Sequence, residues 1–129
     1  MRRAARVGLC AYLLGWIPVN YAVEVFSAAP SIEMRGRAAI VELGFHGVVT
    51  ALSTTAGWML LVRSPAARPT ASAAVVASAI ATIQSLFWTV LPRDIAPGER
   101  LPLAALSIAN AVFWLFIIGR AIDGERYEG

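Results

Sequence analysis

The sequence is poor in charge and in cysteine and contains no lysine. Only 15% of its 129 residues are charged, against about 25% in an ordinary soluble domain. The single cysteine, Cys10, cannot form an intramolecular disulfide bond and is expected to be a small buried apolar residue. With only one histidine, a haem held by two histidines of one chain is excluded. The eleven basic residues are arginines that flank apolar runs, so nucleic acid is not an expected partner.

Four long apolar runs dominate the sequence, and 58% of all residues are hydrophobic. Each run reaches the roughly 20 residues that a helix needs to cross the hydrocarbon core of a bilayer. We predict a single domain over residues 1–129, with spans at 5–26, 38–62, 71–91 and 101–122. The short connections contain proline and glycine and make neighbouring helices antiparallel. The predicted fold is an all-α, up-down antiparallel four-helix transmembrane bundle in the cell membrane, with the lipid bilayer as its main partner.

The arginines near the predicted helix ends indicate an orientation. With the N-terminus inside, seven of the eleven arginines lie on the cytoplasmic side, so we expect both termini in the cytoplasm. An alternative is that the first run is a secretion signal cleaved after Ala29. Pro30 next to that cut and the length of the apolar run count against cleavage.

Six polar side chains interrupt the apolar runs: Asn20, Glu24, Glu42, His46, Gln84 and Asn110. Counting the helix rise from the middle of each run places all six in the outer half of the bundle or at its boundary. Glu42 and His46 are four residues apart, as are Asn20 and Glu24, so each pair shares one helix face. Ionisable groups inside a membrane are costly and are functional candidates by default. We therefore predict a polar site in the outer half.

Two classes of function suit this site. In the first, the protein is a non-catalytic accessory subunit or binds an apolar small molecule, with the ligand-binding residues Asn20, Gln84, Trp88, Asn110, Trp114 and Trp16. In the second, it is an isomerase or cyclase of a lipid or isoprenoid, with Glu42 as acid, His46 as proton relay and Glu24 as second acid or base. A carboxyl group in apolar surroundings keeps its proton more readily, which suits an acid.

Three further interpretations stay open beside these. A small proton-coupled transporter acting as a dimer is the first, although Glu24 lies near a helix end and the arginine bias opposes dual topology. A metal site on Glu42, His46 and Glu24 is the second, but one imidazole and two carboxylates are few ligands for zinc. We predict no metal and no cofactor. The third is that the polar side chains only hydrogen-bond between helices and hold them together.

Small residues recur every four positions in the third run, at Ala73, Ala77, Ala81 and Ser85. Small side chains let helices approach closely in a membrane. We therefore predict that the third helix is central and contacts two neighbours. Its remaining small face would suit a second copy of the chain or a partner membrane subunit.

Overall fold

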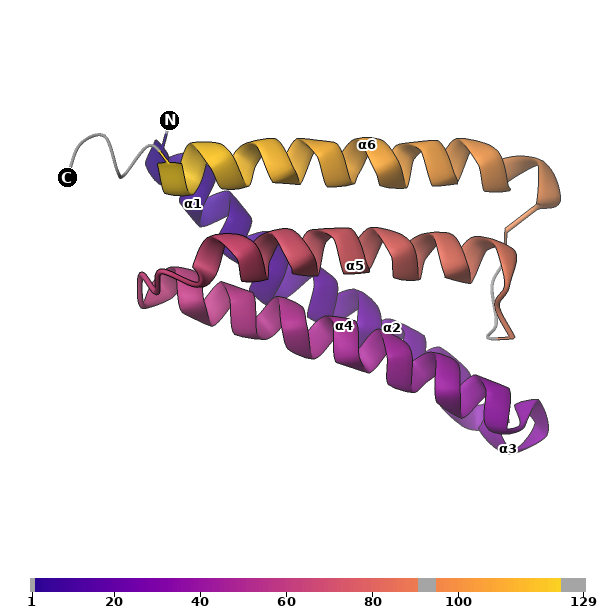
Figure 1. Cartoon of the computed structure of the whole chain (residues 1–129). Coiled ribbons are helices and arrows are strands. Elements are labelled where there is room, and N and C mark those ends of the chain that lie inside the picture. Colours follow the sequence, from indigo (N-terminus) through magenta and orange to yellow (C-terminus); the bar gives the residue numbers. More distant parts are fainter. Residues whose placement is uncertain (1, 91–94, 124–129) are drawn as a thin grey trace.

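The structure, a computed structural model, describes residues 2–90 and 95–123, which are helical apart from short connections (Figure 1). The first segment comprises α1 (Arg2–Ala11), the π-helical η1 (Tyr12–Trp16), α2 (Ile17–Ala28), the 3-10 turn η2 (Ala29–Ser31) and the short α3 (Ile32–Arg35). Then follow α4 (Arg37–Leu61), α5 (Ala67–Phe87), the 3-10 turn η3 (Pro97–Glu99), α6 (Arg100–Ile118) and the π-helical η4 (Gly119–Asp123). Within the described residues no strand is present, and the all-α prediction is confirmed.

The helix ends follow from local chemistry. Gly36 separates α3 from α4 with a φ of 82°, a backbone conformation that side chains disfavour. α5 begins four residues before the predicted span, because Pro69 falls in its first turn, where a missing N–H costs nothing. α5 ends at Phe87, whereas the predicted end of this span, Leu91, lies outside the described residues.

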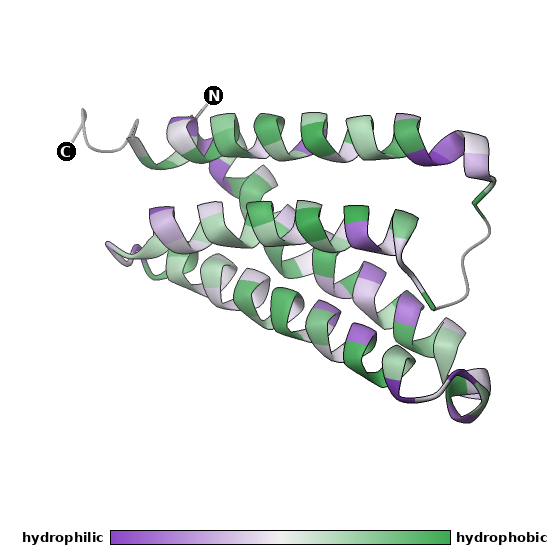
Figure 2. Ribbon diagram, turned by 45° about the vertical axis from the view of Figure 1, so that its right-hand side comes forward, coloured by the Kyte–Doolittle hydropathy of each residue, from purple (hydrophilic) through white to green (hydrophobic). Residues whose placement is uncertain are grey.

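Over residues 2–90 and 95–123, four helical segments are long and apolar enough to cross a membrane: Arg3–Arg35, Arg37–Leu61, Ala67–Phe87 and Pro97–Ile122. Their mean hydropathy reaches 1.2 to 2.2 over the most apolar part of each segment. Figure 2 shows apolar residues along all four segments, with hydrophilic residues gathered mainly at the helix ends and in the connections. Each of these segments overlaps one predicted span, although the first continues past residue 26 to Arg35 and the third begins and ends four residues earlier than predicted.

α5 lies between α4 and α6, and these two helix pairs make the most extensive contacts in the structure. The prediction that the third helix is central is confirmed. The first helix crosses the other three at an angle: α1 contacts α6, η4 and the end of α4, whereas α2 contacts α4 (Figure 1). The core therefore lies nearer the α1 end of the molecule, where Leu9, Leu13, Leu60 and Ile118 are almost fully buried.

The π-helical stretch η1 leaves one backbone carbonyl without a helical donor. The Ile17 N–H donates to the carbonyl of Tyr12, five residues back. In this register the Leu13 carbonyl would receive the N–H of residue 18, but Pro18 has none. The hydroxyl of Ser53, fully buried on α4, supplies the donor, with 2.6 Å between Ser53 Oγ and the Leu13 carbonyl oxygen. A cross-helix hydrogen bond thus compensates for the proline.

Close contact between the first helix and α4 depends on Gly57. A Cβ atom at Gly57 would overlap the side chain of Leu14. We therefore expect Gly57→Ala to lower the free energy of unfolding by about 1–3 kcal/mol, the usual cost of overpacking, as measured by unfolding in mixed micelles. Gly44→Ala is the matched control, because no atom lies within 4 Å of a Cβ there. Equal effects of the two substitutions would contradict the close packing.

Candidate functional site

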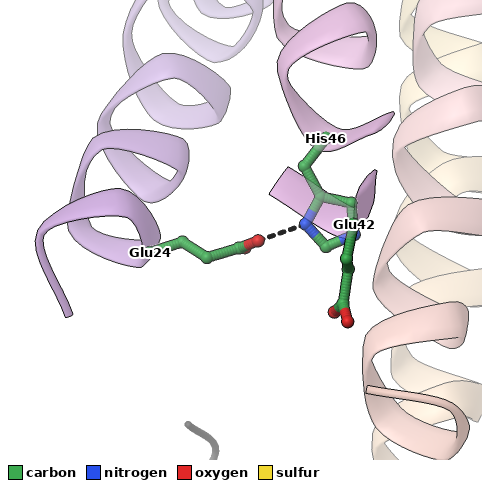
Figure 3. A group of neighbouring side chains, drawn as sticks. All are labelled: Glu24, Glu42 and His46. Atoms are coloured by element: carbon green, nitrogen blue, oxygen red, sulfur yellow. Dashed lines mark hydrogen bonds and ion pairs between the residues drawn. The ribbon is translucent and has the colours of Figure 1, made fainter. Parts of the chain in front are cut away.

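His46 joins three helices through its two ring nitrogens. Its Nδ1 contacts Oε1 of Glu24 on α2, and this pair is shown in Figure 3. Its Nε2 lies 2.8 Å from Oε1 of Gln84 on α5. The Gln84 side-chain nitrogen donates to the carbonyl of Trp88 at an N–O distance of 3.1 Å. His46 itself is only 6% exposed, so this is a buried polar network at the centre of the predicted site.

Glu42 lies one turn before His46 on α4 and is equally buried, at 6% exposure. Its Oε2 accepts a hydrogen bond from the Thr89 hydroxyl at 2.6 Å, and its Oε1 accepts one from the Val90 backbone N–H at 3.0 Å. These donors lie just beyond the C-terminal end of α5, where the chain has left the helix. Glu42 therefore connects this non-helical segment to α4.

A groove of about 930 Å³ opens between the first helix and α6, and α5 and part of α4 form its floor. It exists because the first helix leaves α6 as it crosses toward α4. Along the first helix its lining extends from Gly8 to Glu24, about 24 Å at the helical rise. Most of its lining residues are apolar. The polar ones are Tyr12, Asn20, Tyr21, Glu24, His46, Thr50, Ser78, Thr82, Ser85, Ser107 and Asn110.

Several predicted ligand-binding residues line this groove. Trp114 of α6 stacks on Tyr12, with the ring centroids 4.3 Å apart and the planes at 13°. The Asn110 side-chain nitrogen donates to the Tyr12 hydroxyl at 3.1 Å. Trp16 and Asn20 also line the groove, and the Asn20 amide donates to the Trp16 carbonyl at 2.7 Å. The groove thus brings together Trp16, Asn20, Asn110 and Trp114 with Glu24 and His46.

Gln84, Trp88 and Glu42 do not line the groove. They border a second, smaller hollow of about 410 Å³ on another side of α4 and α5, and Trp88 is 73% exposed there. The predicted layer of six polar residues therefore divides into a groove side and a second side, with His46 between them. A molecule in the groove would contact Glu24 and His46, and not Glu42.

Tyr12 was not among the predicted site residues, although it contacts both Trp114 and Asn110. A signal for it exists in the sequence: Tyr12, Trp16, Asn20 and Glu24 follow one another at intervals of four. This spacing is typical of one helix face. Thr89 was also missed, because the predicted span 71–91 placed it within the third helix, whereas in the structure α5 ends at Phe87.

The polar side chains of the site have hydrogen-bond partners, and several of them also line the groove. Within the described part of the chain, no buried side-chain nitrogen or oxygen lacks a hydrogen-bond partner. This is the pairing expected if polar residues hold the helices together. The groove is a separate property. A bundle packed only for structural stability would leave no open volume of about 930 Å³ between its helices.

The fold and site define a class. In the described part of the chain the protein is all-helical, four of its segments are long and apolar enough to span a membrane, and a buried Glu–His–Gln network lies beside a mainly apolar groove. Comparison with known protein families, with curated proteins and with solved structures finds no match. The function is therefore argued from this geometry.

Proposed function

We propose that the four segments cross a lipid bilayer as an up-down antiparallel bundle with both termini in the cytoplasm. In this bundle the groove binds an amphipathic molecule that enters from the membrane. The apolar body of the ligand lies between the first helix and α6, and its polar group lies at Glu24 and His46. In this function the protein is a non-catalytic binder, and the bilayer supplies its ligand.

The surface of the helices supports membrane insertion. Large apolar side chains on each segment point away from the core: Phe26, Trp58, Ile80 and Phe116 are between 56% and 78% exposed. In water such a surface would drive aggregation, whereas in a bilayer it is solvated by acyl chains. The excess of arginine at the end that carries α1 and the α4–α5 connection supports the orientation.

The groove is the observation that carries the ligand proposal. Sites for small molecules are concave, mostly apolar, and commonly enclose about 300–1,000 Å³, with a few polar groups that orient the ligand. The groove has this volume and this lining. A hydroxyl or amine on the ligand could hydrogen-bond to Glu24, because a carboxylate has several lone pairs to offer.

A brominated long-chain alcohol tests the proposal directly, because bromine quenches the fluorescence of a nearby tryptophan. The full chain is placed in lipid nanodiscs with Trp114 as its only tryptophan, by changing Trp16, Trp58 and Trp88 to phenylalanine. Binding in the groove predicts quenching that saturates at a low mole fraction of the alcohol. Quenching that only rises linearly with the alcohol would show partitioning into lipid and would exclude a binding site.

Filling the groove should abolish this binding. Gly15 lines the groove, and no atom lies within 4 Å of a Cβ built there. We expect Gly15→Leu to weaken binding of the brominated alcohol about tenfold or more. This corresponds to a loss of roughly 1.4 kcal/mol of binding free energy. Gly44→Leu is the matched control, because Gly44 lies on α4 away from the groove with equal room for a side chain. Native saturation in the Gly15 variant would place the ligand elsewhere.

A further inference from the structure

Three potential metal ligands meet beside the groove. One carboxylate oxygen of Glu24, one of Glu42 and a ring nitrogen of His46 lie within 4.8 Å of one another. Glu42 and His46 are four residues apart and project from one face of α4, and Figure 3 shows Glu24 reaching toward them from α2. Zinc holds nitrogen and oxygen ligands at roughly 2.0–2.2 Å, so an ion placed between these three atoms would require only small movements, mainly of the Glu24 side chain.

Contacts outside this group orient the imidazole for a metal ion. Because the Gln84 nitrogen donates to the Trp88 carbonyl, the Gln84 oxygen faces Nε2 of His46. Nε2 therefore carries a ring hydrogen, and Nδ1 is the nitrogen that contacts the Glu24 carboxylate. A metal-ligating histidine almost always donates its other N–H to an oxygen in this way, which fixes the ring and its tautomer.

The Glu42 carboxylate is oriented in the same manner by groups that are not ligands. The Thr89 hydroxyl and the Val90 N–H each donate to one of its oxygens. Ligating carboxylates are commonly hydrogen-bonded by such outer partners, and a carboxylate with two hydrogen bonds still has lone pairs for a cation. Two of the three ligands, His46 and Glu42, are thus buried and held in place, the first by Gln84 in the last turn of α5 and the second by the residues just beyond it.

We propose that Glu24, Glu42 and His46 together bind one divalent transition-metal ion of the zinc type, through one oxygen of each carboxylate and Nδ1 of His46. The imidazole selects zinc-like ions over magnesium and calcium, which prefer oxygen ligands alone. Three protein ligands leave at least one coordination position open. The expectation of no metal relied on the small number of ligands, and the structure adds their mutual distance and their outer contacts.

Metal binding is tested first on the unaltered full chain in detergent micelles, after removal of metal with EDTA. Titration with Zn²⁺ should saturate at one equivalent, and an excess of Mg²⁺ should not compete. Co²⁺ in the same site should give the intense visible absorption of a four- or five-coordinate ion. Absence of saturable Zn²⁺ binding, or a cobalt spectrum equal to that of the ion in water, would overturn the proposal without any variant.

Substitutions then assign the ligands. Glu24→Gln, Glu42→Gln and His46→Gln should each weaken Zn²⁺ binding by about 100-fold or more, with helicity checked by circular dichroism. Gln84 contacts none of the proposed ligand atoms. Gln84→Leu should still weaken Zn²⁺ binding by about 10–100-fold, because the His46 ring loses the hydrogen-bond partner of its Nε2. Glu33→Gln, at an exposed glutamate on α3, is the matched control and should bind as the unaltered chain does. Native affinity in any of the three ligand variants would refute the assignment.

This proposal does not depend on the ligand of the groove. Binding of the brominated alcohol is measured in EDTA, and Zn²⁺ binding is measured without the alcohol. Failure of one experiment therefore leaves the other intact. The two proposals share Glu24 and His46, and a Gly15→Leu protein that still binds Zn²⁺ would show that the metal ligands stay in place when the groove is filled.

Discussion

Replacement of His46 by leucine is expected to lower the free energy of unfolding by about 2–4 kcal/mol, because two partly buried groups each lose a hydrogen-bond partner at about 1–2 kcal/mol, the lower part of the range for buried groups. These groups are the Glu24 carboxylate and the Gln84 amide oxygen, which belong to different helices. The loss should be measured in EDTA by titration with a denaturing detergent, with helicity followed by circular dichroism.

Two conservative variants separate the two contacts of the ring. Asparagine at position 46 places an N–H near the position of Nδ1, so it should recover the contact with Glu24. Glutamine places an N–H near the position of Nε2, so it should recover the contact with Gln84. Phe45→Leu, at the neighbouring and 40% exposed side chain, should change stability by no more than about 0.5 kcal/mol. A His46→Leu protein as stable as the Phe45 variant would refute the network as a stabilising element.

Ser53→Ala should cost about 1–3 kcal/mol, because it leaves the buried Leu13 carbonyl without a donor. The cost should shrink when Pro18 is replaced by alanine in the same chain. Residue 18 then has an N–H, and the carbonyl can be satisfied within its own helix. A double-mutant cycle measures this coupling, which we expect to be about 0.5–3 kcal/mol.

Thr54→Val is the matched control for the loss of a hydroxyl group on α4. The Thr54 hydroxyl donates to the Thr50 carbonyl of its own helix and is exposed. Its removal should therefore change stability little and should show no coupling to Pro18. Additive effects of Ser53→Ala and Pro18→Ala would mean that the proline does not create the need for the serine.

The polar site was partly predictable from spacing and helix rise. Glu42 and His46 share a face because a helix advances by 3.6 residues per turn, and the direction of each run places Glu24 at the same level. The rotation of one helix relative to another does not follow from either quantity. Hence the sequence predicted one layer of six polar residues, whereas the structure separates two of them, Glu42 and Gln84, from the groove.

The sequence by itself determined the four helical segments, because apolar length and the satisfaction of backbone hydrogen bonds within one helix are local properties. It also placed polar residues at one level. Only the tertiary structure decided that a groove exists, because the groove depends on the path of the first helix from α6 to α4. That path is set by contacts between residues far apart in the chain, such as Gly57 with Leu14 and Ser53 with Leu13. No periodicity within a single helix encodes those contacts.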